Sequence, residues 1–131
     1  MDLDDLKSSG KISQGAYDNL KLWLTDPKFS GFKTDVESLL KSNDFATIED
    51  SFYKHIEIGT GGIRGPIGVG PNRINLQTIG EAAQGLSHFI EDFGQEAKGK
   101  GVVVGYEARK LSRAFAELCC AVFAANGIKS Y

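Results

Sequence analysis

The chain has 131 residues, of which 41% are hydrophobic and 24% are charged, and its formal net charge is −2. This length and composition fit one globular domain with a real core and exclude a disordered or fibrous chain. The small net charge excludes a broad basic surface for nucleic acid or for a membrane, so any anion site must be local.

The start of the sequence carries no targeting signal. Residues 1–11 mix acids and lysines without an apolar run, which argues against a signal peptide. The longest apolar run, Leu118–Ala125, is far shorter than the roughly 20 residues that a membrane span needs. We therefore expect a cytoplasmic protein that binds neither nucleic acid nor a membrane.

The first part of the chain is helical and charged in pattern. Apolar residues recur at helical spacing in three segments, residues 16–24, 33–43 and 44–55. Pro27 ends the first of these, and Asn43 suits the C-terminal end of the second. Because short isolated helices are marginal in water, we expect residues 1–55 to form a helical leader packed on a domain over 56–131.

A glycine-rich stretch, "IEIGTGGIRGPIGVGPNRIN", runs from Ile56 to Asn75, and a long helical pattern follows it. Gly94 is a suitable end for that helix. Its apolar stripe consists of Leu76, Ile79, Ala83, Leu86, Ile90 and Phe93.

The last part of the sequence reads as strand, helix, strand. "GVVVGY", residues 101–106, is typical of a strand covered on both faces. We expect Ser112 to cap the next helix, Asn126–Gly127 to end it, and "IKSY" to begin another strand. Such crossovers are almost always right-handed. The pattern predicts an α/β fold: a three-layer α/β/α domain with a mainly parallel or mixed sheet.

The sequence stops four residues into that last predicted strand. We therefore expect part of a longer protein, with its domain truncated at the C-terminal strand. An uncovered sheet edge leaves unpaired backbone groups, so dimerisation through that edge is a further expectation.

The cysteines, Cys119 and Cys120, are neighbours in sequence. Adjacent helical residues cannot easily satisfy disulfide geometry, and two ligands do not make a closed zinc site. We interpret both as small buried hydrophobic residues.

The glycines do not match a generic phosphate motif. The dinucleotide fingerprint would need a third glycine where Arg64 or Arg73 stands, and a P-loop would need lysine where Pro71 follows Gly70. Glycines beside an arginine could instead let a phosphate approach the main chain and the planar guanidinium together. The alternative is a set of tight turns with Arg64 in water.

A second cation follows the second predicted strand. Arg109 lies just beyond "VVVGY", at the end of a strand where open parallel sheets bind ligands. The alternative is a solvated loop on which Arg109 pairs with Glu107. The local sequence leaves both interpretations open.

Several motifs in matching order resemble the first domain of the α-D-phosphohexomutase superfamily. They are "GTGGIRG" (59–65), "GPNRIN" (70–75), "VVVGYEAR" (102–109) and "FAELCCAVFAANGIKSY" (115–131). "WLTDP" and "EDSFYKHIEIGTGGIRG" resemble the long-leader branch of phosphoglucomutase, phosphopentomutase and glucose-1,6-bisphosphate synthase types.

The resemblance implies a mutase in which a phosphoserine donates its phosphoryl group to a sugar phosphate. The bisphosphorylated sugar reorients, and its other phosphate returns to the serine. Mg²⁺ held by aspartates of a second domain and a bisphosphorylated sugar activator belong to this scheme. By the same resemblance, Arg64 would hold the reacting phosphate, Thr60 and the amide of Gly61 would add hydrogen bonds, and Arg109 would lie near the serine loop.

The sequence departs from the family pattern in three respects. The phosphoserine loop and the metal-binding aspartates are absent from these 131 residues, and Glu107 stands where the family usually has Asp. No residue replaces the serine: Ser87 and His88 are helical neighbours that do not face each other, and His55 belongs to the leader. We therefore expect no catalytic or metal-binding residue here.

The sequence thus predicts the N-terminal part of an intramolecular phosphotransferase acting on a hexose or pentose phosphate. We expect the remaining domains of the same protein as partners and no activity from these residues alone. Two alternatives stay open: a module that binds a phosphorylated ligand without chemistry, and a purely structural α/β domain.

Overall fold

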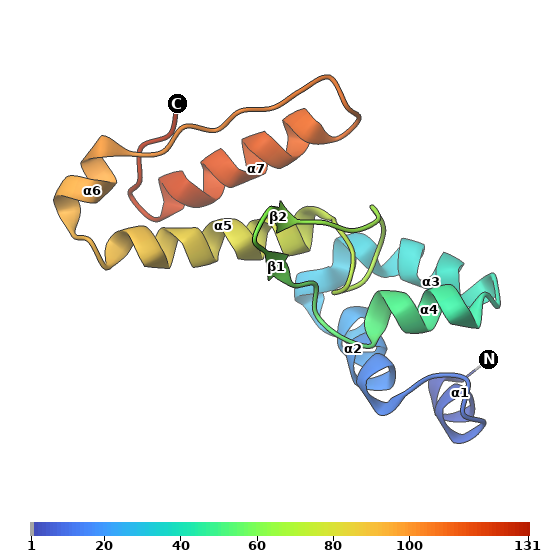
Figure 1. Cartoon of the computed structure of the whole chain (residues 1–131). Helices are drawn as coiled ribbons and strands as arrows, with labels where there is room; N and C mark the ends of the chain where they lie inside the picture. The colour runs from blue at the N-terminus through green and yellow to red at the C-terminus, as the bar shows by residue number, and fades with distance from the viewer. Residues whose placement is uncertain (1) are drawn as a thin grey trace. The chain divides into compact units, whose positions relative to one another are not determined.

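The computed structural model describes residues 2–131, which form helices and a short hairpin (Figure 1). In chain order the elements are α1 (Leu3–Ser8), α2 (Gln14–Thr25), the 3₁₀ helix η1 (Pro27–Phe32), α3 (Lys33–Lys41), α4 (Phe45–Phe52), β1 (Ile58–Gly59), β2 (Gly62–Ile63), α5 (Leu76–Glu91), α6 (Gln95–Lys100) and α7 (Ser112–Ala125). They group into two compact units, one ending at Asn75 and the other spanning Leu76–Tyr131.

Aromatic residues form the centre of the first unit. Trp23 stacks on Phe29 with ring centroids 4.6 Å apart, and Phe52 meets Trp23 edge-on at 5.8 Å. All three side chains are buried, and edge-to-face and stacked pairs add to the free energy gained by burial. The leader helices therefore have a hydrophobic core of their own. Its other buried members are Leu6, Ile12, Ala16, Leu20, Val36 and Ile48.

Side-chain caps fix where two of these helices begin. Ser13 Oγ accepts a hydrogen bond from the amide of Ala16 at the start of α2, and Asp44 accepts one from the amide of Thr47 at the start of α4. Such caps satisfy amides that the first turn leaves without partners. Asn43 follows α3 in the left-handed conformation, φ 56°, which confirms it as the end of that helix.

Two parallel-running helices dominate the second unit. In Figure 1, α5 and α7 pack side by side and point in the same direction. Ala83 of α5 and Phe123 of α7 meet Ile128 in one buried cluster. The side-chain amides of Gln84 and Asn126 hydrogen-bond to each other across the two helices, at 2.8 and 3.1 Å.

The predicted strand–helix–strand unit is present only as a short parallel contact. The amide of Val102 donates to Lys129 O (2.8 Å), and the amide of Tyr131 donates back to Val102 O (3.0 Å). A third bond runs from the amide of Val104 to Tyr131 O at 2.9 Å. This pairing amounts to an isolated parallel bridge between Val102 and Ser130.

The prediction that "GVVVGY" is covered on both faces was wrong. Val102 and Val104 pack on the cluster of Ala83, Phe123 and Ile128, but Val103 is 85% exposed. Regular sheet in residues 2–131 is limited to the antiparallel pair β1–β2. The three-layer arrangement with a mainly parallel sheet therefore stays a prediction.

Other details of the second unit also differ from expectation. The helix α6 has no counterpart in the predicted elements, and Leu76, Leu86 and Phe93 of the predicted apolar stripe are exposed. The cysteines are free but only half-buried, and burial raises the pKa of the Cys119 thiol. Ser112 does not cap α7; its hydroxyl accepts a hydrogen bond from the amide of Glu107 instead.

The division into units and the predicted domain boundary fall at different places. The first compact unit ends at Asn75, whereas the predicted leader ends at residue 55. The leader and the glycine-rich stretch thus share one compact unit. No helix within residues 2–131 has the length and apolar character needed to cross a membrane.

Candidate functional site

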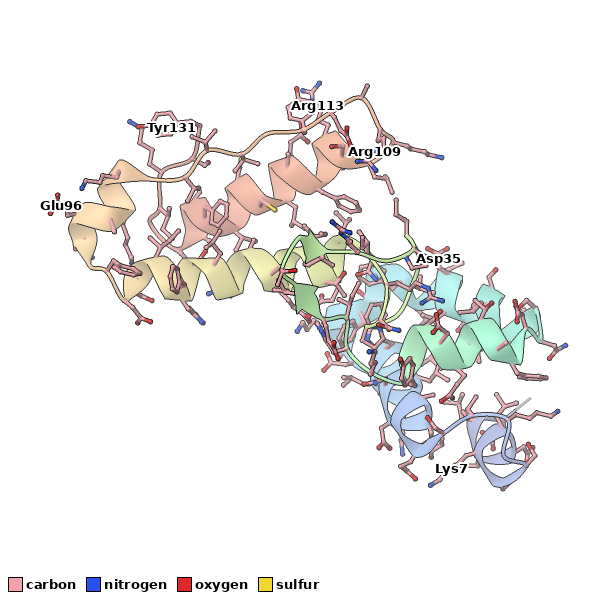
Figure 2. All side chains as sticks on the ribbon, in the orientation of Figure 1. Lys7, Asp35, Glu96, Arg109, Arg113 and Tyr131 are labelled. Carbon is pink, nitrogen blue, oxygen red and sulfur yellow. The ribbon has the colours of Figure 1, made fainter. Side chains whose placement is uncertain are left out.

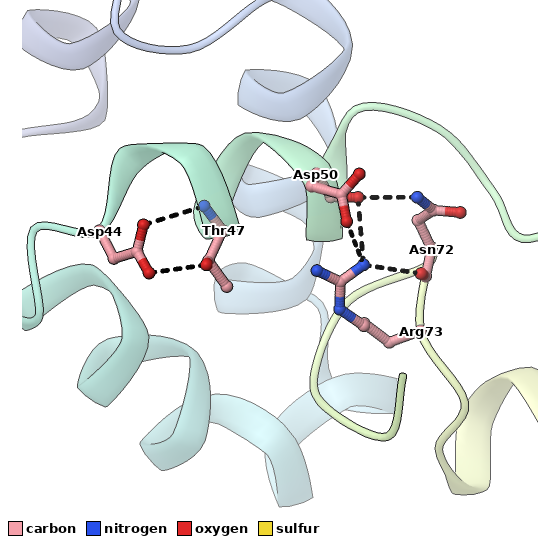
Figure 3. Close-up of polar contacts among 5 residues, drawn as sticks. All are labelled: Asp44, Thr47, Asp50, Asn72 and Arg73. Atoms are coloured by element: carbon pink, nitrogen blue, oxygen red, sulfur yellow. Dashed lines mark hydrogen bonds and ion pairs between the residues drawn. The ribbon is translucent and has the colours of Figure 1, made fainter. Parts of the chain in front are cut away.

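The segment 70–75 is attached to the last turn of α4. The amide of Asn72 donates to Ser51 O (3.0 Å), and its side-chain amide donates to Asp50 O (2.8 Å). Arg73 Nη1 lies 2.7 Å from Asp50 Oδ2, an ion pair visible in Figure 3. These contacts join residues about twenty positions apart, so they restrict a glycine-rich segment whose backbone has many accessible conformations.

Close packing of the main chain explains one of the glycines. Gly70 has φ +111°, and a Cβ at this position would lie 2.4 Å from Ser51 O. Only glycine permits both the positive φ and this approach to α4. The side-chain amide of Asn75 donates to Gly68 O (2.8 Å) and Gly70 O (2.9 Å), so the turn is also held from inside.

The hairpin β1–β2 projects from this attached segment. Ile58 pairs with Ile63 and Gly59 with Gly62, and Thr60 and Gly61 form the turn. Gly62 adopts φ +99°, a conformation that glycine reaches without steric cost and that lets the chain make this tight turn. The turn is exposed, so its amides are available to a ligand.

Arg64 follows the hairpin and folds back over it. Its Nη2 would lie 2.7 Å from a Cβ on Gly61, so the guanidinium rests against the turn. The side chain is exposed and borders a shallow hollow of about 450 Å³. The hollow is lined by Glu57, Gly59, Thr60, Gly61, Gly62 and Arg64. The structure thus brings together three of the predicted site residues, Arg64, Thr60 and Gly61.

The charge around the hollow is mixed. Lys54 Nζ lies 3.4 Å from Glu57 Oε1, and hydrogen bonds to Tyr53 and to Glu57 raise the pKa of Lys54. The ammonium offsets the carboxylate at the rim. Among residues 2–131, Arg64 forms no ion pair, so its guanidinium can turn its fork of donors toward an anion.

The fourth predicted residue, Arg109, belongs to the other compact unit. It lies on the loop that precedes α7 (Figure 2). Its side chain is 85% exposed. Its Nε donates to the carboxylate of Glu107, as in the solvated-loop interpretation. Leu111 ends this loop with φ +71°. The structure therefore gives Arg109 a carboxylate partner and does not assign it to the hollow.

The roles of three residues escaped the sequence analysis. Arg73 is only 8% exposed and serves as an anchor, a role that the sequence analysis did not assign to it. Its partner, Asp50, lies 23 positions away on an amphipathic helix, so no local spacing marks the pair. Glu57 at the rim of the hollow was also missed.

The other polar residues considered have structural partners. Ser87 Oγ donates to Ala83 O within α5, and His88 contacts Gln84 one turn earlier. His55 Nδ1 lies 2.9 Å from Ile56 O. Within residues 2–131, no three His, Cys, Asp or Glu side chains gather in a group that could bind a metal ion.

Comparison with known proteins gives consistent matches. Residues 55–131 match the family model described as "Phosphoglucomutase/phosphomannomutase, alpha/beta/alpha domain I". A "Probable phosphoribomutase" of Schizosaccharomyces pombe is 36% identical over 76% of this chain and 17% of its own length. A phosphoglucomutase of Staphylococcus haemolyticus is 33% identical over 73% of this chain and 17% of its own length.

A human phosphopentomutase is 31% identical over 83% of the chain and 19% of its own length. The chain therefore spans less than a fifth of each of these relatives. No solved structure matches.

Proposed function

Since this chain belongs to the phosphoglucomutase/phosphomannomutase family, of the α-D-phosphohexomutase superfamily, we propose that it is the N-terminal part of a phosphosugar mutase. The single observation that carries the proposal is the guanidinium of Arg64 resting on the β1–β2 turn, beside Thr60 and the exposed amides of a shallow hollow. The proposed substrate is a hexose or pentose phosphate, in keeping with the glucose, ribose and pentose in its relatives' names.

The proposed reaction exchanges a phosphoryl group between serine and sugar. The P–O bond to a phosphoserine outside these residues breaks, and a P–O bond to a free sugar hydroxyl forms, while the hydroxyl proton passes to a base. The bisphosphorylated sugar reorients, and its other phosphoryl group returns to the serine. Transfer of this kind depends on positioning and on neutralising charge at the phosphoryl oxygens.

Within this scheme Arg64 holds and neutralises the phosphate group that reacts. A planar guanidinium can donate two parallel N–H bonds to a phosphate, and the amides of Thr60 and Gly61 can add further donors. The Lys54–Glu57 pair keeps the carboxylate at the rim from repelling the anion. Arg109 is proposed as a second phosphate contact, after separating from Glu107.

A magnesium ion is expected in the family scheme, where it would stabilise charge on the phosphoryl group when bound. Residues 2–131 offer no group of carboxylates, histidines or cysteines that fits such an ion, so no step is assigned to it here. We propose that its ligands, and the contacts that select the sugar, belong to other domains of the protein.

The test uses the longest natural protein that contains this sequence, assayed as a mutase with glucose 1-phosphate and with ribose 1-phosphate. Arg64→Ala should lower kcat/KM by about a hundredfold, since one lost donor to the reacting group costs that much in other enzymes. Arg64→Lys should fall between, because lysine lacks the bidentate fork.

Arg113→Ala is the matched control, because Arg113 is an exposed arginine of α7 paired with Glu117. It should retain wild-type kinetics. Absence of mutase activity with both sugars, or full activity of Arg64→Ala, would contradict the proposal. The 131-residue chain alone should show only background turnover, and turnover above background would place the nucleophile within it.

A further inference from the structure

We infer that Arg73 and Asp50 form a positioning pair that holds the phosphate-binding hairpin in place from the leader. The inference rests on the proposed function in one respect: it takes Arg64 as the residue that the hairpin presents. Its structural part, the attachment of the hairpin through Arg73, stands on observed contacts alone.

Both ends of the hairpin are tied to one short segment. The amide of Ile56 donates to Pro71 O at 2.8 Å, and the amide of Ile74 donates to Pro66 O at 2.9 Å. These two bonds bracket residues 57–65, which include β1, the turn, β2 and Arg64. The position of the hairpin therefore depends on the position of residues 71–74.

Residues 71–74 are in turn set by α4. The Arg73 side chain is 9% exposed, and its Nη1 contacts Asp50 Oδ2 at 2.7 Å and Asn72 O at 3.1 Å. The amide of Asn72 adds a bond to Ser51 O. The contacts with Asp50 and Ser51 fall on the C-terminal end of α4, where Figure 3 shows the pair of Arg73 and Asp50, so the segment is anchored at one place.

Charge makes this anchor sensitive to single substitutions. A guanidinium buried to this extent is costly without a carboxylate partner, since removal of one member leaves a desolvated charge. Asp50 is more exposed, with 57% of its side chain accessible, so it can be changed without opening a cavity. Asp50→Asn therefore weakens the anchor while keeping the volume of the side chain.

A contact that only stabilised the leader would behave differently. Loss of such a contact would lower the unfolding midpoint but leave the hairpin attached until the whole unit unfolds. A positioning contact instead controls a local opening of lower free energy than global unfolding. The two roles are separated by reading the amides of Ile56 and Ile74 individually.

The experiment measures amide hydrogen exchange by NMR in the 131-residue chain for Asp50→Asn, Arg73→Gln and Arg73→Lys. Thr47→Ala is the matched control, because Thr47 caps the opposite end of the same helix through Asp44 (Figure 3). We expect amide exchange at Ile56 and Ile74 to quicken about tenfold in Asp50→Asn and Arg73→Gln, because loss of the anchor lowers the free energy of a local opening. Arg73→Lys should restore part of the protection, and Thr47→Ala should leave both amides as in the wild type.

A titration with inorganic phosphate gives the functional readout. Asp50→Asn should weaken the phosphate-induced shifts of Gly61 and Arg64 relative to both the wild type and Thr47→Ala. Unchanged exchange at Ile56 and Ile74, or exchange that rises equally in Thr47→Ala, would overturn the inference. Faster exchange with unchanged phosphate shifts would likewise overturn it, while leaving the proposed function intact.

A wild-type chain without phosphate shifts would count against the proposed function and not against the pair. In that case the exchange rates decide whether Arg73 positions the hairpin. If Arg73→Gln unfolds the leader, Asp50→Asn supplies the same comparison at an exposed residue.

Discussion

The guanidinium of Arg64 lies so close to Gly61 that a Cβ at position 61 would be 2.7 Å from Nη2. The absence of a side chain at Gly61 therefore makes room for the guanidinium of Arg64 against the turn. The contact involves the far end of a long side chain, so a larger residue at 61 would displace the arginine rather than the backbone.

Gly61→Ala is expected to move Arg64 without unfolding the chain. Since a charge-assisted hydrogen bond contributes about 1.5–3 kcal/mol, phosphate affinity should fall about tenfold or more. The measurement is a phosphate titration followed by NMR. Gly59→Ala is the matched control, because its Cβ would meet only Gly62 O at an ordinary 3.6 Å. Equal affinity of the two variants would contradict this account of the turn.

Gly70→Ala should destabilise the first unit severely. Gly70 has φ +111°, and an added Cβ would lie 2.4 Å from the backbone oxygen of Ser51 in α4. Because the clashing atom belongs to the backbone of a helix, it cannot move aside cheaply. A loss of at least about 3 kcal/mol in the free energy of unfolding is expected from such a clash. Urea denaturation followed by the fluorescence of Trp23 measures it.

The comparison for Gly70 is Gly10→Ala. Gly10 also has a positive φ, +72°, but a Cβ there would meet nothing within 4 Å. Its cost should be the backbone strain alone, about 1 kcal/mol. If the two variants were equally stable, the close approach of Gly70 to Ser51 would not be a constraint on the fold.

Arg109→Ala is expected to leave stability unchanged to within about 0.5 kcal/mol, because exposed ion pairs contribute little. Its side chain is 85% exposed, and that of Glu107 is 57% exposed. In the proposed mutase, however, the same variant should lower kcat/KM if Arg109 contacts a phosphate. Thermal unfolding of the 131-residue chain and kinetics of the longer protein give the two measurements. A large change in stability would show that the loop depends on this pair.

Local pattern predicted much of the helical structure. The spacing of apolar residues indicated α2, α3, α4 and α5, and Asn43 ends α3 where the sequence suggested. These signals depend on residues within one or two turns of each other, which a single sequence displays directly. The family resemblance, carried by "GTGGIRG", is confirmed by the match over residues 55–131.

Features that depend on distant partners could not be predicted. The burial of Arg73 follows from Asp50, and the exposure of Val103 follows from which neighbours cover residues 102–104. An unbroken run of β-branched residues suits a fully covered strand, but coverage is a property of the surrounding fold. The same limit applies to Arg109, where Glu107 competes with any ligand.

The Asp44 cap predicts a pH dependence of the first unit. Hydrogen bonds from the hydroxyl and then the amide of Thr47 lower the pKa of Asp44 below its ordinary value of 3.8. Because the folded-state pKa is depressed, the stabilisation is present above the ordinary pKa and is lost as pH falls through the folded one. Asp44→Ala should therefore be less stable than the wild type near neutral pH and should approach it in acid. Urea midpoints of both proteins, measured across this range, check the sign; a constant difference would contradict the ionised cap.

The contact between Gly101 and Lys129 offers a final test, on the second unit. Gly101 has φ +77°, and a Cβ there would lie 2.2 Å from Lys129 O, the atom that accepts the amide of Val102. Gly101→Ala should break this first bond of the parallel contact and free residues 128–131 from residues 102–104.

Gly127→Ala is the matched control, since Gly127 has φ +71° but open space around it, so it carries only the strain of about 1 kcal/mol. Amide exchange at Val102, Val104 and Tyr131 should quicken far more in Gly101→Ala than in Gly127→Ala. Similar protection of these amides in both variants would mean that the strand pairing does not depend on the approach of Gly101, and that the helices α5 and α7 alone hold the C-terminal residues in place.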